Sequence, residues 1–161
     1  MKKLLVRDLL TLSPTPPCVV RGDADARLVV ERMLHDRSKR EVYLVDEAGR
    51  FLGVIPLRRL AQHLFHHAVP DRTATQMLDL VSARNAGDLA RKKVAVVRLD
   101  DHMDEVLDAM FRYHFDEVPV VDADGVVVGS LNMLDLVAAA HAGHFDEPRD
   151  AGATDDREAS G

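Results

Sequence analysis

The segment REVYLVDEAGRFLGVIPLRRL at residues 40–60 is the most informative part of the sequence, because the chain repeats it as DEVPVVDADGVVVGSLNMLDL at residues 116–136. The two stretches align at an offset of 76 without a gap, so that Gly49 meets Gly125 and most apolar positions coincide. In repeat proteins each copy is one supersecondary unit that cannot cover its own hydrophobic face. The sequence therefore predicts two similar halves that pack against each other.

The similarity extends upstream of these stretches. The same offset of 76 pairs Val20 with Val96. Further back, VRDLL at residues 6–10 resembles AGDLA at residues 86–90, now at an offset of 80. The first half therefore carries four extra residues, in its Pro-rich segment SPTPP. Almost the whole chain, apart from its C-terminal end, belongs to the repeat.

Each half shows the same order of expected elements. Apolar residues at helical spacing predict helices over LVVERML and MDEVLDAMF. The β-branched runs VYLVD and VPVVD, each followed by a glycine-containing turn and a second apolar run, predict hairpins. Helices then close each half at LRRLAQHLF and MLDLVAAA. A short β run before the first helix completes the order β-α-β-β-α, which occurs twice.

Aspartates precede the first helix of each half and are candidates for its N-cap. These are Asp23 and Asp25 in the first half and Asp100 and Asp101 in the second. An aspartate side chain at this position accepts hydrogen bonds from the unpaired amides of the first helical turn. We therefore expect one aspartate of each pair to cap its helix.

Composition sets limits on the function. The chain has 161 residues, of which 47% are hydrophobic and 30% are charged, as in an ordinary globular protein. Its net charge of −6 comes mostly from the tail at residues 145–161, which holds six acids and two arginines. The nearly balanced body does not favour nucleic acid as a partner. The tail has no apolar periodicity, and we expect it to be mobile.

Export, membrane insertion and disulfide bonding are not expected. The N-terminal apolar patch is broken by Arg7 and Asp8, and no apolar run approaches the roughly 18 residues of a membrane helix. Cys18 is the only cysteine. These observations predict a cytoplasmic protein.

The string apolar-Pro-Val-Val-Asp-x-x-Gly-x-x-x-Gly-apolar-apolar, which follows a helix and is used twice, resembles the CBS domain family over residues 6–140. The resemblance implies an α/β (α+β) fold in which two β-α-β-β-α repeats pack pseudo-symmetrically into one CBS pair, a Bateman module. We expect the first repeat at residues 1–72, a linker and the second repeat at residues 73–144, and the acidic tail at residues 145–161.

The resemblance also implies a ligand site. CBS pairs that bind adenosyl ligands carry Gly-apolar-apolar-Thr/Ser-x-x-Asp after the last strand, and the second repeat matches it with Asp135 at the ribose position. Asn132 replaces the hydroxyl residue of the pattern. By the same resemblance, the backbone at Val118 and Pro119 would contact the adenine edge. Pro119 could equally be only a tolerated strand residue, and Asp135 only an acid in a first helical turn.

The first repeat departs from this pattern. Pro56 stands in place of the hydroxyl residue and Arg59 in place of the acid, so we expect no ribose binding of the family type there. Arg59 could hold an anion or be an ordinary solvated arginine. Before the middle strands, where relatives place basic residues against phosphate, this chain has Arg40 and Glu41, and Asp116 and Glu117. Because carboxylates repel phosphate, we expect an uncharged or cationic adenosyl ligand, or a metal-bridged nucleotide, near Asp135.

Catalytic motifs are not evident. The glycines at Gly49 and Gly53 lack the third glycine of a dinucleotide-binding loop, and no P-loop or GxSxG is present. His63 and His67 are four residues apart and could share a helix face that binds zinc. His63, His66, His67, His141 and His144 also suit helix C-termini, where imidazoles favour the negative end of the dipole.

We therefore expect a regulatory module and not an enzyme. By the family resemblance it would need no cofactor, bind AMP, ADP, ATP or S-adenosylmethionine, form a flat homodimer through helix faces, and act on a regulated enzyme or transporter. Ligand would shift the population between two arrangements of the halves. Two alternatives remain open: a ligand-free interaction scaffold, and a small histidine-based metal protein.

Overall fold

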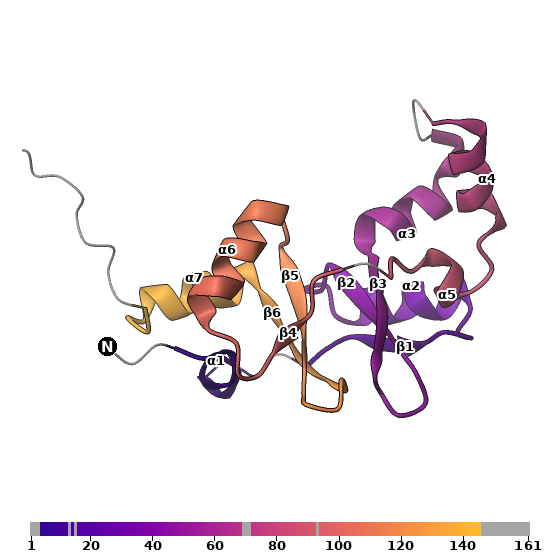
Figure 1. The fold of residues 1–161 in the computed structure, drawn as a ribbon. Coiled ribbons are helices and arrows are strands. Elements are labelled where there is room, and N and C mark those ends of the chain that lie inside the picture. Colours follow the sequence, from indigo (N-terminus) through magenta and orange to yellow (C-terminus); the bar gives the residue numbers. More distant parts are fainter. Residues whose placement is uncertain (1–3, 13, 15, 69–71, 93, 146–161) are drawn as a thin grey trace, which may run out of the picture.

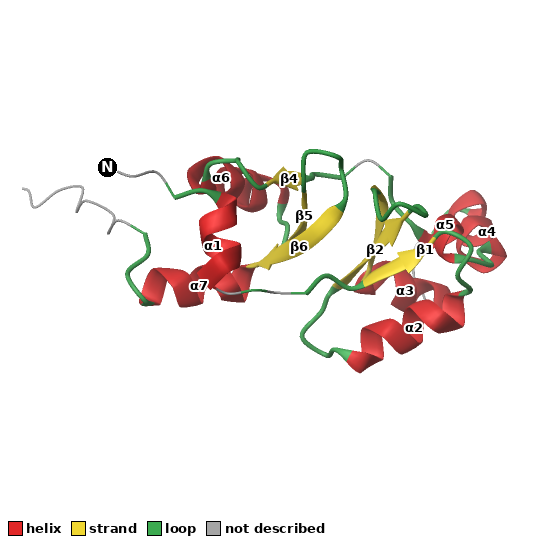
Figure 2. Ribbon diagram, turned by 90° about the horizontal axis from the view of Figure 1, so that it is seen from below, coloured by secondary structure: helices red, strands yellow, loops and turns green. Residues whose placement is uncertain are grey.

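The computed structural model describes residues 4–145 except residues 13, 15, 69–71 and 93. The expected mobility of the acidic tail concerns residues that lie almost entirely outside this range. Two halves stand side by side, each with one three-stranded sheet and helices on its outer side (Figures 1 and 2). The prediction of an α+β fold made of two packed repeats is confirmed.

The first half forms a sheet of order β1-β2-β3, with β1 and β2 parallel and β2 and β3 antiparallel. Its elements are β1 (Val19–Arg21), α2 (Ala26–His35), β2 (Glu41–Val45), β3 (Phe51–Pro56), α3 (Leu57–Leu64) and the 3-10 turn η1 (His66–Ala68). Both predicted helices and the predicted hairpin lie where the sequence pattern places them. In the turn, Gly49 has φ 80°, a left-handed conformation that favours glycine.

The second half repeats this arrangement with a sheet of order β4-β5-β6. Its elements are β4 (Val97–Arg98), α6 (Met103–Tyr113), β5 (Glu117–Val121), β6 (Val127–Asn132) and α7 (Met133–His141). Val120 pairs with Gly129 as Leu44 pairs with Gly53, so the offset of 76 holds through both hairpins. In the turn, Gly125 has φ 81°, as the Asp124-Gly125 signal predicts.

The offset changes in the first strand of each half. Val20 pairs with Leu44 and Val97 pairs with Val120, so Val97 and not Val96 is the counterpart of Val20. The expected continuation of the 76-residue offset is therefore wrong there by one residue. The first half has five residues between α2 and β2, where the second has three between α6 and β5. Because α6 is one residue longer than α2, the helix and this loop together account for the change of one residue.

The N-cap prediction is right in one half and wrong in the other. In the first half, the backbone N–H of Leu28 donates to the Asp25 carboxylate at 2.8 Å. In the second half His102 occupies the N-cap without a side-chain bond, and the Asp101 carboxylate accepts from the Arg98 amide instead. The chain's N-terminal segment takes the capping role, because the N–H of Met103 donates to the carbonyl of Leu4 at 3.0 Å.

The two halves exchange their short leading helices. Helix α1 (Val6–Leu12) packs into the second half, where Val6 and Leu9 share a buried cluster with Val118 and Leu131. Helix α5 (Ala86–Leu89) packs into the first half, in a cluster with Val29 and others. The sequence similarity between residues 6–10 and 86–90 therefore marks two equivalent helices, each in the core of the other repeat (Figure 2). The expected domain boundaries stay a prediction.

The segment between the repeats contains one further helix, α4 (Ala74–Ser82), which the sequence reasoning did not anticipate. Its N-terminus forms a capping box, in which Thr73 and Gln76 bond each other's backbone. This pattern satisfies two otherwise unpaired amides of the first turn. Among the helices of the described ranges, none has the length and apolar character to cross a bilayer.

Candidate ligand-binding pocket at the seam between the repeats

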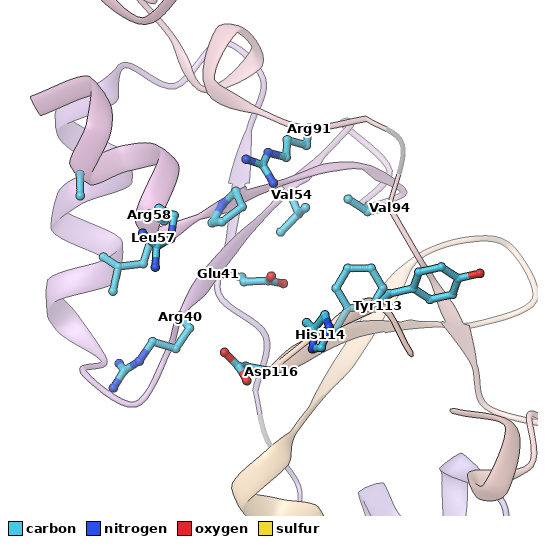
Figure 3. A pocket seen from close by; sticks show the side chains of 13 residues that line it. Arg40, Glu41, Val54, Leu57, Arg58, Arg91, Val94, Tyr113, His114 and Asp116 are labelled. Carbon is cyan, nitrogen blue, oxygen red and sulfur yellow. The ribbon is translucent and has the colours of Figure 1, made fainter. Parts of the chain in front are cut away.

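A pocket of about 570 Å³ opens where the first repeat faces the end of α6 and the start of β5 (Figure 3). Both repeats contribute to its wall. The lining residues are Arg40, Glu41, Val54, Pro56, Leu57, Arg58, Ala61, Arg91, Val94, Tyr113, His114, Phe115 and Asp116. A volume of this size can enclose a small metabolite.

One side of the pocket is fixed by backbone pairing between β3 and the linker. The N–H of Val54 donates to the carbonyl of Arg91 at 2.9 Å, and the N–H of Arg91 donates to the carbonyl of Val54 at 2.7 Å. The close approach requires glycine at the preceding position, because a Cβ at Gly53 would lie 2.8 Å from the Arg91 carbonyl oxygen. These two bonds form an isolated antiparallel bridge that holds the linker beside the pocket.

Basic and acidic side chains line the pocket together. Arg58, in the first turn of α3, and Arg91, on the linker, are exposed, whereas Glu41 is half-buried at the start of β2. Figure 3 shows the carboxylates of Glu41 and Asp116 in the same part of the pocket, and the Arg40 side chain directed away from them. The Arg40 guanidinium donates to the backbone carbonyls of Arg37 and Lys39.

The surroundings of Glu41 favour its protonated form. Burial in the first place, and then the negative charges of Glu117 and Asp116, raise the pKa of the Glu41 carboxyl to about 8 against the opposing effect of Arg91. A carboxyl with such a pKa is largely neutral at pH 7 and ionises when a cation approaches. Perturbed carboxyl groups in a pocket are typical of functional sites.

A small apolar recess continues the pocket inward. It has a volume of about 20 Å³ and is lined by Glu41, Val54, Val94, Ala95, Phe115, Glu117, Val118 and Pro119. Three residues proposed from the sequence, Glu117, Val118 and Pro119, therefore lie together next to the pocket, whose own lining includes Asp116 and Arg40. The structure thus brings five of the eight predicted site residues to one place.

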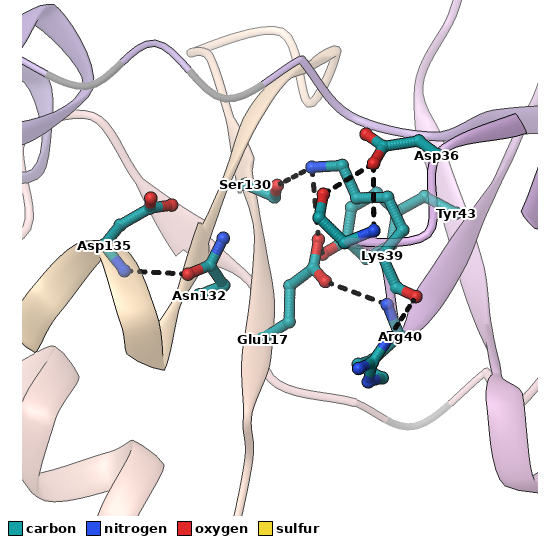
Figure 4. Close-up of polar contacts among 9 residues, drawn as sticks. Asp36, Lys39, Arg40, Tyr43, Glu117, Ser130, Asn132 and Asp135 are labelled. Atoms are coloured by element: carbon teal, nitrogen blue, oxygen red, sulfur yellow. Dashed lines mark hydrogen bonds and ion pairs between the residues drawn. The ribbon is translucent and has the colours of Figure 1, made fainter.

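A buried polar cluster joins the repeats behind this recess (Figure 4). Lys39 and Glu117 are each 2% exposed, and the Lys39 Nζ lies 3.7 Å from Glu117 Oε1. The Lys39 ammonium also donates to Ser130 Oγ at 3.2 Å, and the Tyr43 hydroxyl donates to Glu117 Oε1 at 3.2 Å. Burial raises the pKa of the Tyr43 phenol, and the neighbouring carboxylates raise it further, so Tyr43 remains a neutral donor.

The ribose pattern lies at a different place. Asn132 caps α7, since its Oδ1 accepts from the Asp135 backbone N–H at 2.8 Å (Figure 4). Both residues are half-buried, and neither belongs to the lining of the 570 Å³ pocket. That pocket is at the N-terminus of α3, in the half that lacks the family pattern. The role of Asp135 stays a prediction.

Arg59 does not line the pocket either. Its guanidinium pairs with Asp79 of α4 at 2.7 Å, and its side chain is 16% exposed. This ion pair ties the closing helix of the first repeat to the inserted helix. An anion at Arg59 would have to compete with the Asp79 carboxylate.

The histidines do not form a cluster typical of a metal site. His66 Nδ1 lies 3.1 Å from the carbonyl oxygen of His63, and the His66 and His67 rings meet edge to face. Within residues 4–145, apart from the gaps, no group of three or more His, Cys, Asp or Glu is placed to hold a metal ion. The structure gives the zinc alternative no support.

Sequence reasoning missed several residues of the pocket. Arg58 and Arg91 lie outside the family pattern, and Tyr113 and Phe115 look like an ordinary helix end. A usable signal was the offset of 76, which places Asp116 opposite Arg40 and Phe115 opposite Lys39. At both pairs the first half has a basic residue and the second half has none, so the sequence indicates that the two sides of the seam differ in charge.

Comparison with known proteins identifies the family. The sequence pattern of the CBS domain matches residues 6–66 and 86–142. The magnesium transporter MgtE of Thermus thermophilus is 31% identical over 114 residues, which are 71% of this chain and 22% of the transporter. The chain thus spans about a fifth of that relative's length.

Solved structures agree with this assignment. A CBS domain-containing protein from Thermotoga maritima superposes with a TM-score of 0.73 at 28% identity, covering 92% of this chain and all of that one. The CBS domain pair of protein MJ0100, in complex with 5′-methylthioadenosine and S-adenosyl-L-methionine, has a TM-score of 0.66 at 21% identity and covers 89% and 99% of the two chains. The chain belongs to the CBS domain family and forms a CBS pair.

Proposed function

We propose that this CBS pair is a non-catalytic ligand sensor that binds an adenosyl-containing metabolite in the pocket at the seam. The observation that carries the proposal is a 570 Å³ pocket whose wall comes from both repeats. A ligand that contacts both halves can favour one arrangement of them over another. AMP, ADP, ATP and S-adenosylmethionine are the candidate ligands.

The chemistry of the pocket supports a ligand with one flat apolar part and one polar part. Val54, Val94 and Phe115 offer apolar surface to a base, next to Val118 and Pro119 in the recess. The exposed guanidinium groups of Arg58 and Arg91 offer hydrogen bonds to an anionic group, which arginine recognises well. The solved pair of MJ0100 with two adenosyl compounds is a precedent for this ligand class on the same fold.

The output would pass to a partner or to an attached domain. The similarity to part of MgtE makes a transporter one candidate for the regulated protein. We also propose a homodimer formed through helix faces. It is supported by exposed apolar side chains on α2, α3, α6 and α7, namely Leu28, Leu34, Leu57, Leu64, Phe111, Leu134 and Val137. Exposed apolar surface of this kind is typical of interaction sites.

Native mass spectrometry of gently purified protein, followed by thermal melting with each candidate compound, tests the proposal. We expect a dimer, and a rise in melting temperature with at least one adenosyl compound, because binding to the folded state raises apparent stability. A dimer that no adenosyl compound stabilises would contradict the sensor and favour the interaction scaffold instead.

A further inference from the structure

The two repeats differ in charge at equivalent positions beside the seam. Lys39 and Phe115 each stand two residues before a central strand, β2 or β5. Glu41 and Glu117 are the first residues of those strands. The Nζ of Lys39 lies 3.7 Å from Oε1 of Glu117, so the ammonium group compensates the charge of this carboxylate within the seam. Phe115, in the corresponding place of the second repeat, gives Glu41 an aromatic ring and no positive charge.

The charged groups around Glu41 leave its carboxylate undercompensated. The second repeat contributes the acids Asp116 and Glu117 and the imidazole of His114. Three arginines also line the pocket, namely Arg58, Arg91 and Arg40. Arg40 donates its guanidinium to backbone carbonyls. Burial raises the pKa of Glu41 most, the nearby acids Glu117 and Asp116 raise it as well, and Arg91 only partly opposes these effects. An additional positive charge next to Glu41 would therefore be favourable.

Two aromatic rings, those of Tyr113 and Phe115, also line the pocket. Tyr113 and Phe115 have their ring centroids 6.0 Å apart, and both belong to the lining. A ring face attracts a cation within about 6 Å of its centre, most strongly a weakly hydrated one. Carboxylates beside aromatic rings are a combination suited to sulfonium and substituted ammonium groups.

We propose that Glu41 makes the seam pocket selective for an adenosyl ligand with a positive charge next to its nucleoside, over neutral and anionic adenosyl compounds. The inference rests on the proposed function and specifies the ligand class. The cationic centre lies between Glu41 and Asp116 and the rings of Tyr113 and Phe115. The exposed Arg58 and Arg91 then hold the carboxylate of the ligand's amino-acid end. Binding ionises Glu41, so a proton leaves as the cation enters.

Calorimetric titration with three compounds tests this selectivity. S-adenosylmethionine is a sulfonium, S-adenosylhomocysteine is the neutral thioether that lacks only the methyl group and its charge, and AMP is anionic. We expect the sulfonium to bind at least about tenfold more tightly than the thioether, which corresponds to about 1.4 kcal/mol. In buffers of different ionisation enthalpy, sulfonium binding near pH 7 should release a proton and thioether binding should not.

The variant Glu41→Gln is the decisive comparison. It keeps the size and hydrogen-bonding capacity of the side chain, and we expect it to abolish both the sulfonium preference and the proton release. Glu105→Gln removes the same charge from an exposed position on α6 and should retain both. Thermal melting of each variant establishes that it is folded.

The other outcomes are equally informative. If the thioether or AMP binds as tightly as the sulfonium, or if Glu41→Gln keeps the preference, the selectivity proposal is overturned while the sensor proposal stands. If none of the three compounds binds to the wild-type protein, the selectivity proposal is overturned, and the sensor proposal is overturned with it when ADP and ATP do not bind either.

Discussion

Glu41 lowers the stability of the folded protein at neutral pH, and it is also the residue that we propose to select the ligand. The pKa of its carboxyl is about 8 in the folded protein, against an ordinary value near 4.5. Between these values the unfolded chain loses the proton while the folded chain keeps it. Stability therefore falls as pH rises through this window and levels off above it. Such a cost at a pocket is typical of positions retained for function.

The first prediction concerns this pH dependence. Glu41→Gln should be more stable than the wild type at pH 8.5 and nearly equal to it at pH 4.5, because glutamine does not ionise. The full effect is about 1.4 kcal/mol per unit of pKa elevation, reduced by solvent at this half-buried side chain. At about 2–4 °C per kcal/mol, the melting temperatures should separate by several degrees. Parallel curves across the whole pH range would show that Glu41 is not perturbed.

Lys39 and Glu117 form the opposite case, a buried charge with its partner. Lys39→Met should cost about 3–5 kcal/mol of unfolding free energy, because it leaves Glu117 buried without a counter-charge. The double variant Lys39→Met with Glu117→Gln should recover much of this loss. Urea denaturation of the single and double variants measures the coupling. A Lys39→Met protein as stable as the wild type would mean that the pair contributes nothing.

The sequence could show that these charges were present but not how they pair. Lys39 precedes a strand like many surface lysines, and its burial depends on Ser130 and Glu117, which are 91 and 78 positions away in the chain. The pattern around Asp135 predicts a site at the start of α7, whereas the 570 Å³ pocket lies at the start of α3. A linear motif identifies one residue, while a pocket depends on segments that meet only in the fold.

At the scale of elements, the bridge between Val54 of β3 and Arg91 of the linker holds one side of the pocket wall. Gly53→Ala should destabilise the protein by about 1–3 kcal/mol, since its Cβ would lie 2.8 Å from the Arg91 carbonyl oxygen. It should also weaken binding of any pocket ligand by displacing Arg91. Gly22→Ala is the matched control, because no atom lies within 4 Å of a Cβ at that position. Equal thermal stability of the two variants would contradict the close packing of the linker.

The packing of α1 in the second half predicts which of its leucines stabilises the protein. Leu9 of α1 is 1% exposed in the second half's core, so Leu9→Ala should cost about 2–5 kcal/mol. Leu12 of the same helix is 52% exposed, and Leu12→Ala should cost less than about 0.5 kcal/mol. Hydrogen exchange should show the Leu9→Ala effect first in β4–β6 and α6. An effect confined to β1–β3 would mean that α1 belongs to the first repeat.

Sequence periodicity predicted the helices and hairpins well, because each depends on local pattern. It did not predict α4 or the exchange of α1 and α5. Residues 6–10 resemble residues 86–90 whichever repeat each helix packs against. Sequence similarity therefore cannot show whether a helix packs in the core of its own repeat or in the core of the other repeat. The N-cap of α6 failed for a related reason, since a distant carbonyl, that of Leu4, meets the first turn.

At the scale of the molecule, the repeats are held together along the seam by their hairpin turns as well as by the buried cluster. The N–H of Phe51 donates to the Gly125 carbonyl at 2.9 Å, and the N–H of Val127 donates to the Gly49 carbonyl at 3.1 Å. The pocket lies at another part of the same seam. A ligand there is therefore well placed to bias how the halves are arranged.

Nuclear magnetic resonance with uniformly ¹⁵N-labelled protein tests the central claim, that an adenosyl ligand binds between the repeats. During titration with S-adenosylmethionine and AMP, we predict saturable shifts of backbone amides on both sides of the pocket. Val54 and Arg91 would report the first side, and Phe115 and Asp116 the second. Saturating shifts confined to the outer surface of one repeat would contradict binding between the repeats. So would the absence of shifts with both S-adenosylmethionine and AMP.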